Sequence, residues 1–240
     1  MKKFFVGIFG LALMTLGAGG VFAEELSDGN YKNSNDVIID GSKYEKLCEI
    51  YSENFIEFLT QEEYDNIKDK DLDNVTIEET IDYNLARGAS YSTSYKSIRL
   101  VNNNGYITLM LVWLQMPSVR SYDVLAVRLS STSISGTPSF KQVYYNSGTY
   151  TSTTGSRQSF SNGYGVSFLL ALGTSLESYL SFYVTESGTV YGAYQHATSS
   201  VTLANSKNYT ISSSGYGGVI NFASSVADYY DHMSGVSLAV

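Results

Sequence analysis

Two histidines are the side chains of this sequence best suited to acid–base chemistry near neutral pH. His196 lies at the end of a predicted strand, in residues 194–197, and His232 follows Tyr229–Asp231. A nucleophilic hydrolase also needs a nucleophile and an orienting group. Serines are abundant, but no Gly-x-Ser-x-Gly elbow is present, because Gly165–Ser167 continues as Phe-Leu. A secreted hydrolase using His196 or His232 is therefore an alternative hypothesis, and we assign no catalytic residue.

The sequence predicts no metal site and no cofactor. Cys48 is the only cysteine, so no intramolecular disulfide can form, and it lies in the apolar stripe of a predicted helix, where burial is expected. One cysteine and two distant histidines lack the spacing of zinc ligands. The carboxylates of residues 69–73 alternate as in a calcium loop, but Asn74 replaces the required Gly and Thr80 replaces the required Glu. We interpret residues 69–73 as an acidic linker.

The few acidic residues beyond position 85 do not form a recognisable glycosidase pair. Such enzymes need two carboxylates that face one sugar bond. Here the acids are scattered over separate predicted strands and turns: Asp123, Glu177, Glu186, Asp228 and Asp231. We expect Glu186 to be a turn residue and Asp123 to pair with Arg120 across a turn.

Aromatic residues point towards binding rather than catalysis. The chain has 21 tyrosines, and Tyr and Trp faces are suited to contacts with sugars and other extracellular ligands. Trp113 lies in the middle of an apolar strand and is predicted to belong to the core. Several tyrosines lie within predicted strands, where cross-strand packing is an equally good role: Tyr145, Tyr179, Tyr183, Tyr191 and Tyr194. The ligand-binding residues therefore stay unassigned.

The formal net charge of −8 is unevenly distributed along the chain. Most acidic residues lie in residues 24–85, whereas the remainder is weakly basic and takes its polarity from Ser, Thr, Tyr, Gly and Asn. The acidic segment argues against a nucleic-acid partner, because phosphate backbones require clustered Lys and Arg. A surface rich in hydroxyl groups fits a protein that works outside the cell.

The N-terminal residues have the three-part pattern of a cleavable signal peptide. Lys2 and Lys3 are followed by the uncharged apolar run Phe4–Leu16 and then by small residues that end at Ala23. This run is shorter than the ~20 residues that a membrane span requires. We predict cleavage near Ala23, an extracellular mature chain from about Glu24, and no transmembrane anchor in it.

A small acidic helical segment is predicted for residues 42–88. It follows residues 24–41, which we interpret as a flexible lead-in whose Val37–Ile39 docks on the remainder. Three capping boxes of the form Ser/Thr-x-x-Glu begin at Ser42, Thr60 and Thr76. The last of them predicts a helix from Thr76 to about Arg87 that ends at Gly88.

Residues 89–240 change to the two-residue period of β-strands. The run 106–116 is apolar on both faces, as expected of a central strand, and further short strands are separated by Gly, Ser and Asn turns. These further predicted strands are 122–129, 140–145, 164–172, 179–184, 189–195, 201–203, 209–212 and 218–222. The fold class is therefore mainly β: an antiparallel β-sandwich, jelly-roll-like or Greek key, preceded by the helical segment.

We hypothesise an exported β-sandwich module that binds a glycan or another cell-surface component. The secreted hydrolase is the first alternative, and a β pore-forming or membrane-interacting protein is the second. For the latter, Gly148–Gly163 is rich in Ser and Thr, but its apolar alternation is thin, so we interpret it as a long surface loop.

Overall fold

The computed structural model describes residues 23–85, 92–213, 218–231, 233 and 235–240. The predicted signal peptide up to residue 22, Gly88 and His232 lie outside the described residues. Within the described ranges, no helix is both long and apolar enough to cross a membrane.

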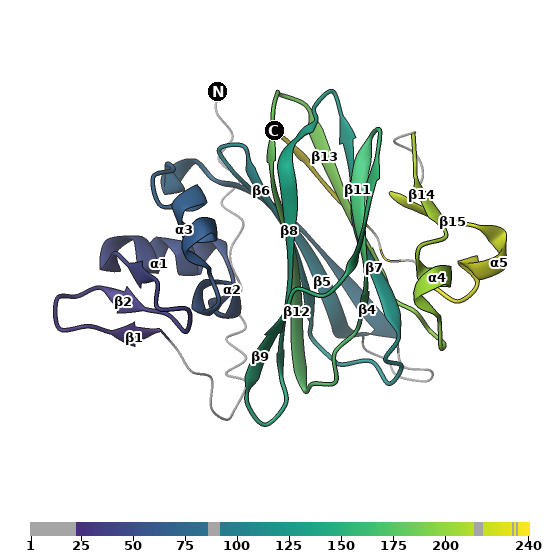
Figure 1. Ribbon diagram of the computed structural model, residues 1–240, viewed down its shortest axis with the longest axis horizontal. Coiled ribbons are helices and arrows are strands. Elements are labelled where there is room, and N and C mark those ends of the chain that lie inside the picture. Colours follow the sequence, from purple (N-terminus) through teal and green to yellow (C-terminus); the bar gives the residue numbers. More distant parts are fainter. Residues whose placement is uncertain (1–22, 86–91, 214–217, 232, 234) are drawn as a thin grey trace.

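Two antiparallel sheets stack face to face (Figure 1). One has six strands in the order β4-β5-β6-β12-β8-β9, and the other has five in the order β10-β11-β7-β13-β16. The strands of the first sheet are β4 (Thr76–Leu85), β5 (Ser92–Asn103), β6 (Tyr106–Trp113), β12 (Ser175–Val184), β8 (Ile134–Tyr145) and β9 (Thr149–Ser152). Those of the second are β10 (Ser156–Phe160), β11 (Gly163–Leu169), β7 (Tyr122–Ser130), β13 (Thr189–Gln195) and β16 (Val236–Ala239). The mainly β, antiparallel sandwich is confirmed.

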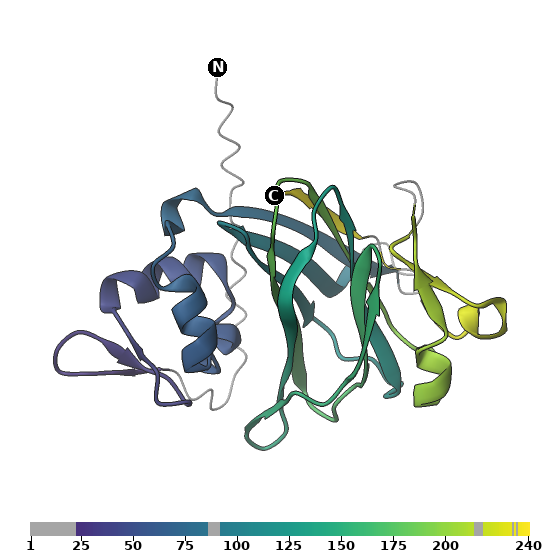
Figure 2. The same cartoon turned by 45° about the horizontal axis from the view of Figure 1, so that its top comes forward.

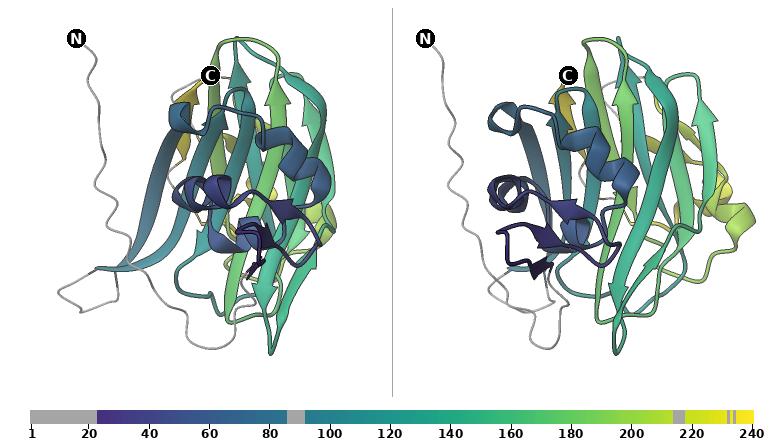
Figure 3. Two further views of the ribbon diagram at one scale, coloured as in Figure 1. Left: turned by 90° about the vertical axis from the view of Figure 1, so that its left-hand side faces the viewer. Right: turned by 60° about the vertical axis from the view of Figure 1, so that its left-hand side comes forward.

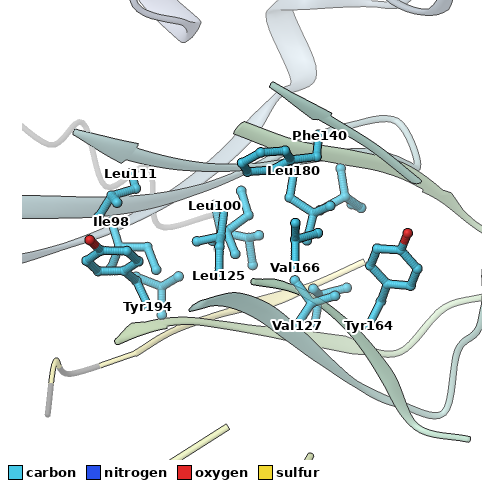
Figure 4. Close-up of a cluster of buried hydrophobic side chains, with 14 of the residues drawn as sticks. Ile98, Leu100, Leu111, Leu125, Val127, Phe140, Tyr164, Val166, Leu180 and Tyr194 are labelled. Carbon is cyan, nitrogen blue, oxygen red and sulfur yellow. The ribbon is translucent and has the colours of Figure 1, made fainter. Parts of the chain in front are cut away.

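The main core fills the space between the two sheets. Leu100, Leu180 and Phe140 of the six-stranded sheet point towards Leu125 and Val166 of the five-stranded sheet (Figure 4). All five side chains are almost completely buried. Alternation along each strand supplies them, because every second residue faces the same side of a sheet.

The N-terminal segment covers the outer face of the six-stranded sheet (Figure 3). It consists of the small sheet of β1 (Glu24–Glu25), β2 (Tyr31–Lys32) and β3 (Ile38–Ile39), then α1 (Gly41–Ile50), α2 (Glu53–Glu57), α3 (Gln61–Ile67) and the 3-10 turn η1 (Leu72–Asn74). Its apolar residues pack on Met110 and Tyr179 of the sheet. This cover explains why β6 is apolar on both faces, as predicted.

A C-terminal segment covers the outer face of the five-stranded sheet and lies on the opposite side of the molecule from the helices (Figures 1 and 2). It contains α4 (Leu203–Ser206), β14 (Tyr209–Ile211), β15 (Ile220–Phe222) and α5 (Ser224–Ala227). Tyr209, Ile220 and Tyr230 pack there against Val124 and Ala126 of β7. The sandwich is thus covered on both outer faces.

The helix predicted from Thr76 to about Arg87 is wrong, because Thr76–Leu85 is strand β4. Thr76, Ile77, Thr80 and Ile81 are β-branched and favour a strand. The segment also pairs with β5 along its whole length. A local capping motif stabilises a helix weakly, whereas this ladder satisfies every second backbone group of the segment.

The capping boxes at the first two helices have different outcomes. The box of Thr60 and Glu63 is confirmed, with both reciprocal hydrogen bonds present. The box at Ser42 is wrong, because α1 begins at Gly41 and its N-cap is Asp40, two residues before Ser42. The Asp40 carboxylate accepts hydrogen bonds from the backbone N–H groups of Ser42 and Lys43, at 3.0 and 3.3 Å.

Three other segments differ from the prediction. Residues 24–41, expected to be a flexible lead-in, contain the three small strands β1 to β3. Val37 and Ile39 dock in the core as expected, whereas Ile38 between them is exposed. Gly148–Gly163, predicted to be a surface loop, contains β9 and β10, because Ser and Thr side chains suit exposed edge strands. Residues 201–203 do not form a strand, since Thr202 caps α4 instead.

Candidate functional site

Antiparallel pairing of β13 with β7 brings His196 to Asp123. Gln195, the last residue of β13, pairs with Val124 near the start of β7. His196 therefore lies next to Asp123, the residue before Val124. The Nδ1 atom of His196 lies 3.0 Å from each carboxylate oxygen of Asp123. An ionised carboxylate only accepts hydrogen bonds, so Nδ1 carries the proton and donates.

Asp123 is completely buried and receives two further hydrogen bonds. The backbone N–H of Ala197 donates to it at 2.8 Å, and the hydroxyl of Tyr194 donates to its second oxygen. Burial raises the pKa of the Asp123 carboxyl, while the hydrogen bonds from His196, Tyr194 and Ala197 oppose this rise. Burial and the neighbouring carboxylate raise the pKa of Tyr194 well above its usual value, so its hydroxyl stays a donor.

The orientation of the imidazole is fixed from two sides. Asp123 holds Nδ1, and the ring of Trp113 lies edge-on at 5.0 Å between centroids, with an interplanar angle of 81°. The other ring nitrogen, Nε2, has no hydrogen-bond partner in the described part of the chain. With the proton on Nδ1, the neutral imidazole presents an acceptor at Nε2.

A second carboxylate, that of Asp231, lies beside the histidine. It accepts a hydrogen bond from the backbone N–H of His196 at 2.9 Å and forms an ion pair with Lys96. Lys96 is completely buried, with its ammonium group 5.3 Å from the Trp113 ring centroid and 5.7 Å from that of Tyr194. The ion pair therefore neutralises a buried cation, while the Asp231 side chain keeps 25% of its surface exposed.

His196 and Asp231 line a small open pocket. Its volume is about 180 Å³, and the lining residues are Pro117, Ser118, Val119, His196, Thr198 and Asp231. This is smaller than the roughly 300–1,000 Å³ of typical small-molecule sites. The pocket can therefore hold one polar group of a larger ligand, rather than a whole ligand.

The loops around the pocket are tied to one another. Ser121 donates to the carbonyl of Val201 at 3.1 Å and accepts from its N–H at 2.7 Å, which joins the β6–β7 loop to the chain after β13. Leu170 donates to the carbonyl of Ser121 at 2.9 Å, and Arg120 donates to that of Gly173 at 3.1 Å, which adds the β11–β12 loop. The rim of the pocket is therefore built on rigid strands and cross-linked loops.

Two expectations about the acidic residues are corrected here. Asp123 was expected to pair with Arg120, but it is enclosed at the start of β7 and binds His196 instead. The acids beyond residue 85 were expected to be scattered, yet Asp123 and Asp231 converge on His196. The sequence did not indicate this arrangement, because these residues are far apart along the chain. The pairing of β7 with β13 brings Asp123 to His196, and the bridge between Ala197 and Tyr230 brings Asp231 there.

The remaining candidates do not join this site. Glu177 lies between the helices and the sheet, where it accepts from Ser52 at 2.5 Å and from Asn54 at 2.7 Å. Glu186 is an exposed turn residue as predicted, and Asp228 is exposed. Cys48 is half-buried, and burial raises the pKa of its thiol. His232 lies outside the described residues.

The acidic linker and the aromatic residues take structural roles. In residues 69–73, Asp73 pairs with Lys46 at 2.6 Å and Asp71 caps η1. No group of three potential metal ligands occurs among the residues that the structure describes. Trp113 is buried, as predicted. Tyr179 and Tyr194, for which the sequence left packing and binding open, are buried as well.

No protein-family model matches the chain. No curated protein matches it either. Among solved structures, it is similar to the KRT10-binding region domain of the pneumococcal serine rich repeat protein PsrP, with 9% identity and a TM-score of 0.31. That match covers 50% of this chain and 88% of the other. At this TM-score the similarity supports no conclusion about function, which must come from the site itself.

Proposed function

We propose that the chain is an exported β-sandwich binding module that holds a hydroxyl-bearing group of an extracellular ligand, such as a glycan, in the His196 pocket. One observation carries the proposal. His196 and Asp231 line the same pocket, while buried partners hold both side chains in place. Two fixed acceptors suit a ligand that offers hydroxyl donors.

Exposed apolar side chains at the same end of the sandwich support the proposal. Leu114 follows β6, Leu169 ends β11 and Leu172 precedes β12, and they are 39%, 54% and 69% exposed. β7 begins opposite Leu169 and close to the end of β13, so all three lie at the pocket end. They can pack on the apolar face of a sugar whose hydroxyl enters the pocket.

A glycan array and a cell-wall pull-down test this function. We expect the mature chain to capture a glycan or wall fraction. Ser118→Trp should lose this capture at least about tenfold, because the indole fills the pocket while Asp123 and His196 themselves are unchanged. Ser118 is exposed, so this variant is expected to fold normally. Ser187→Ala, in the exposed turn before β13, is the matched control and should bind like the wild type. No capture by the wild type on either assay would refute the proposal.

A hydrolase is the second candidate, and the Asp123–His196 pair favours it. Asp123 orients the imidazole, Nε2 can act as a general base, and Ser118 lines the same pocket. However, within the described residues no hydroxyl group is hydrogen-bonded to Nε2, so no nucleophile is assembled. This candidate predicts turnover of p-nitrophenyl esters or glycosides that falls at least about 100-fold in His196→Gln. Absence of turnover by the wild type would remove it.

A further inference from the structure

The outer face of the five-stranded sheet holds a buried cation that the His196 pocket does not use. Arg128 of β7 is only 5% exposed. It lies on the same face of the strand as Val124 and Ala126, which contact the C-terminal cover. Arg128 is five positions after Asp123 in the sequence, a distance of about 17 Å along β7. It therefore belongs to a separate location.

Tyr191 and Gly163 are the cross-strand neighbours of Arg128. The guanidinium carbon lies 3.6 Å from the centroid of the Tyr191 ring, so the two planar groups are in close contact. On the other side the register places Gly163 opposite Arg128. Glycine has no side chain, and a methyl group of Ile211 lies 3.0 Å from the position that its Cβ atom would take, so this position supplies no polar partner for the guanidinium.

In the described part of the chain, no anion pairs with Arg128. Among the described residues, none forms a hydrogen bond or an ion pair with its guanidinium, and its Nε is buried without a partner. The five acids beyond residue 85 are occupied or distant. Asp123 and Asp231 accept hydrogen bonds from His196. Glu177 accepts a hydrogen bond from Ser52 of the helical segment. Glu186 and Asp228 are exposed at other places on the surface.

An unpaired buried guanidinium is strongly unfavourable, and one cation–π contact offsets only part of the lost hydration. Arg128 keeps 5% of its surface exposed, and Nε is the one nitrogen of its guanidinium that is both fully buried and without a described partner. Two adjacent N–H groups on a planar, aromatic-backed fork match the geometry of a carboxylate, which accepts two parallel hydrogen bonds.

We propose that Arg128 and Tyr191 form a binding site for the carboxylate group of an acidic ligand, such as an acidic sugar. Arg128 supplies the charge and the paired donors. Tyr191 holds the guanidinium plane and prevents it from turning away from the surface. The site is independent of the His196 pocket and stands whether or not that pocket binds a ligand.

Thermal unfolding in sodium glucuronate tests this site, with glucose and sodium chloride at matched concentration and ionic strength as references. We expect glucuronate to raise the melting temperature of the wild type by about 2–5 °C above both references. Arg128→Met should lose this rise and should melt at the same or a higher temperature without the anion, because it removes an unpaired buried charge. Arg157→Met, on the exposed side of β10, is the matched control and should keep the rise.

Further variants and anions separate a carboxylate site at Arg128 from the alternative explanations of the rise in melting temperature. Arg128→Lys keeps the charge but loses the fork, and should retain less than half of the rise even if Arg128→Met does not fold. Ser118→Trp should retain all of it, which separates this site from the His196 pocket. Equal melting of the wild type in glucuronate, glucose and chloride would overturn the proposal. A larger rise in sulfate or phosphate than in glucuronate would overturn the carboxylate preference.

Discussion

Nδ1 of His196 lies 3.0 Å from both carboxylate oxygens of Asp123, although the two residues are 73 positions apart in the sequence. This contact orients the ring of His196, which lines the pocket. It also places a buried carboxylate at the junction of β7, β13 and the C-terminal segment. The same contact therefore contributes to the stability of this end of the sandwich and to the orientation of His196 in the pocket.

Replacement of this carboxylate should destabilise the fold. In Asp123→Asn only one oxygen remains to accept from His196, Tyr194 and Ala197, and the new amide N–H₂ faces donors. We expect a loss of about 2–4 kcal/mol in the free energy of unfolding, measured by urea denaturation. Asp228→Asn, at an exposed position, should change it by less than about 0.5 kcal/mol. A loss of that small size in Asp123→Asn would show that the buried hydrogen bonds are unimportant.

The protonation state of the imidazole can be observed directly. Because Asp123 accepts from Nδ1, the neutral ring should carry its proton there and leave Nε2 as an acceptor. In ¹⁵N NMR spectra at high pH, Nδ1 should show a pyrrole-type shift and Nε2 a pyridine-type shift. The reverse pattern would contradict the arrangement of the pocket. Ligand binding through a hydroxyl donor should move the Nε2 signal more than the Nδ1 signal.

Much of the sandwich could be predicted from the sequence, because alternation and turn residues act locally. The strand at Thr189–Gln195 was predicted with its observed bounds. The strand at Thr76–Leu85 was missed, because a helix-capping motif and β-branched residues gave conflicting local signals and only pairing with β5 decides between them. Local sequence cannot report such pairing.

The candidate site was predictable only in part. His196 was recognised from its residue type, but its partners were not. The register of β7 and β13 places Asp123 beside His196, and the bridge between Ala197 and Tyr230 places Asp231 there. Lys96 has no motif of its own, and its role follows from burial beside Trp113. The sequence likewise does not distinguish Arg128 from any other strand residue. Its burial and its lack of a described partner appear only in the structure.

The helical segment should be fixed to the sheet by one buried ion pair. Lys141 of β8 donates to the Glu63 carboxylate at 2.7 Å and to the carbonyl of Phe58 at 2.6 Å. Lys141→Met leaves Glu63 buried without its cation, so we expect a loss of about 3–5 kcal/mol in the free energy of unfolding. Amide hydrogen exchange should accelerate most in α2 and α3.

The same measurement on an exposed ion pair provides the control. The Nζ atom of Lys32 lies 2.6 Å from Oδ1 of Asp36 on the surface. Lys32→Met should therefore change the free energy of unfolding by less than about 1 kcal/mol. The double variant Lys141→Met/Glu63→Gln should recover part of the loss, because no charge stays unpaired. Additive losses in the double variant would mean that the two side chains do not interact.

The proposed export of the chain makes a prediction about its N-terminus. Cleavage after Ala23 should leave Glu24 as the first residue of protein recovered from the culture medium, as measured by intact-mass spectrometry. Ala23→Arg should block cleavage, because the −1 position requires a small residue. Recovery of the uncleaved wild-type chain from the cytoplasm would contradict both export and the proposed extracellular ligand.

Glu57 of α2 should make stability depend on pH between mildly acidic and neutral conditions. Burial raises the pKa of its carboxyl, whereas the hydrogen bonds from Ser34 lower it, and burial has the larger effect. The folded state therefore binds the proton more tightly than the unfolded state does. The stability that this proton provides is present in full below the unfolded pKa and is lost as the pH rises through the folded pKa.

The variant Glu57→Gln tests this sign, because it keeps an acceptor for Ser34 but cannot ionise. We expect the free energy of unfolding of the variant, relative to the wild type, to increase from pH 4 to pH 7 in urea titrations. Glu62→Gln, on the exposed face of α3, should show no such trend. A relative stability of Glu57→Gln that falls over the same interval would mean that the folded state favours the ionised carboxylate, with the Ser34 hydrogen bonds outweighing burial.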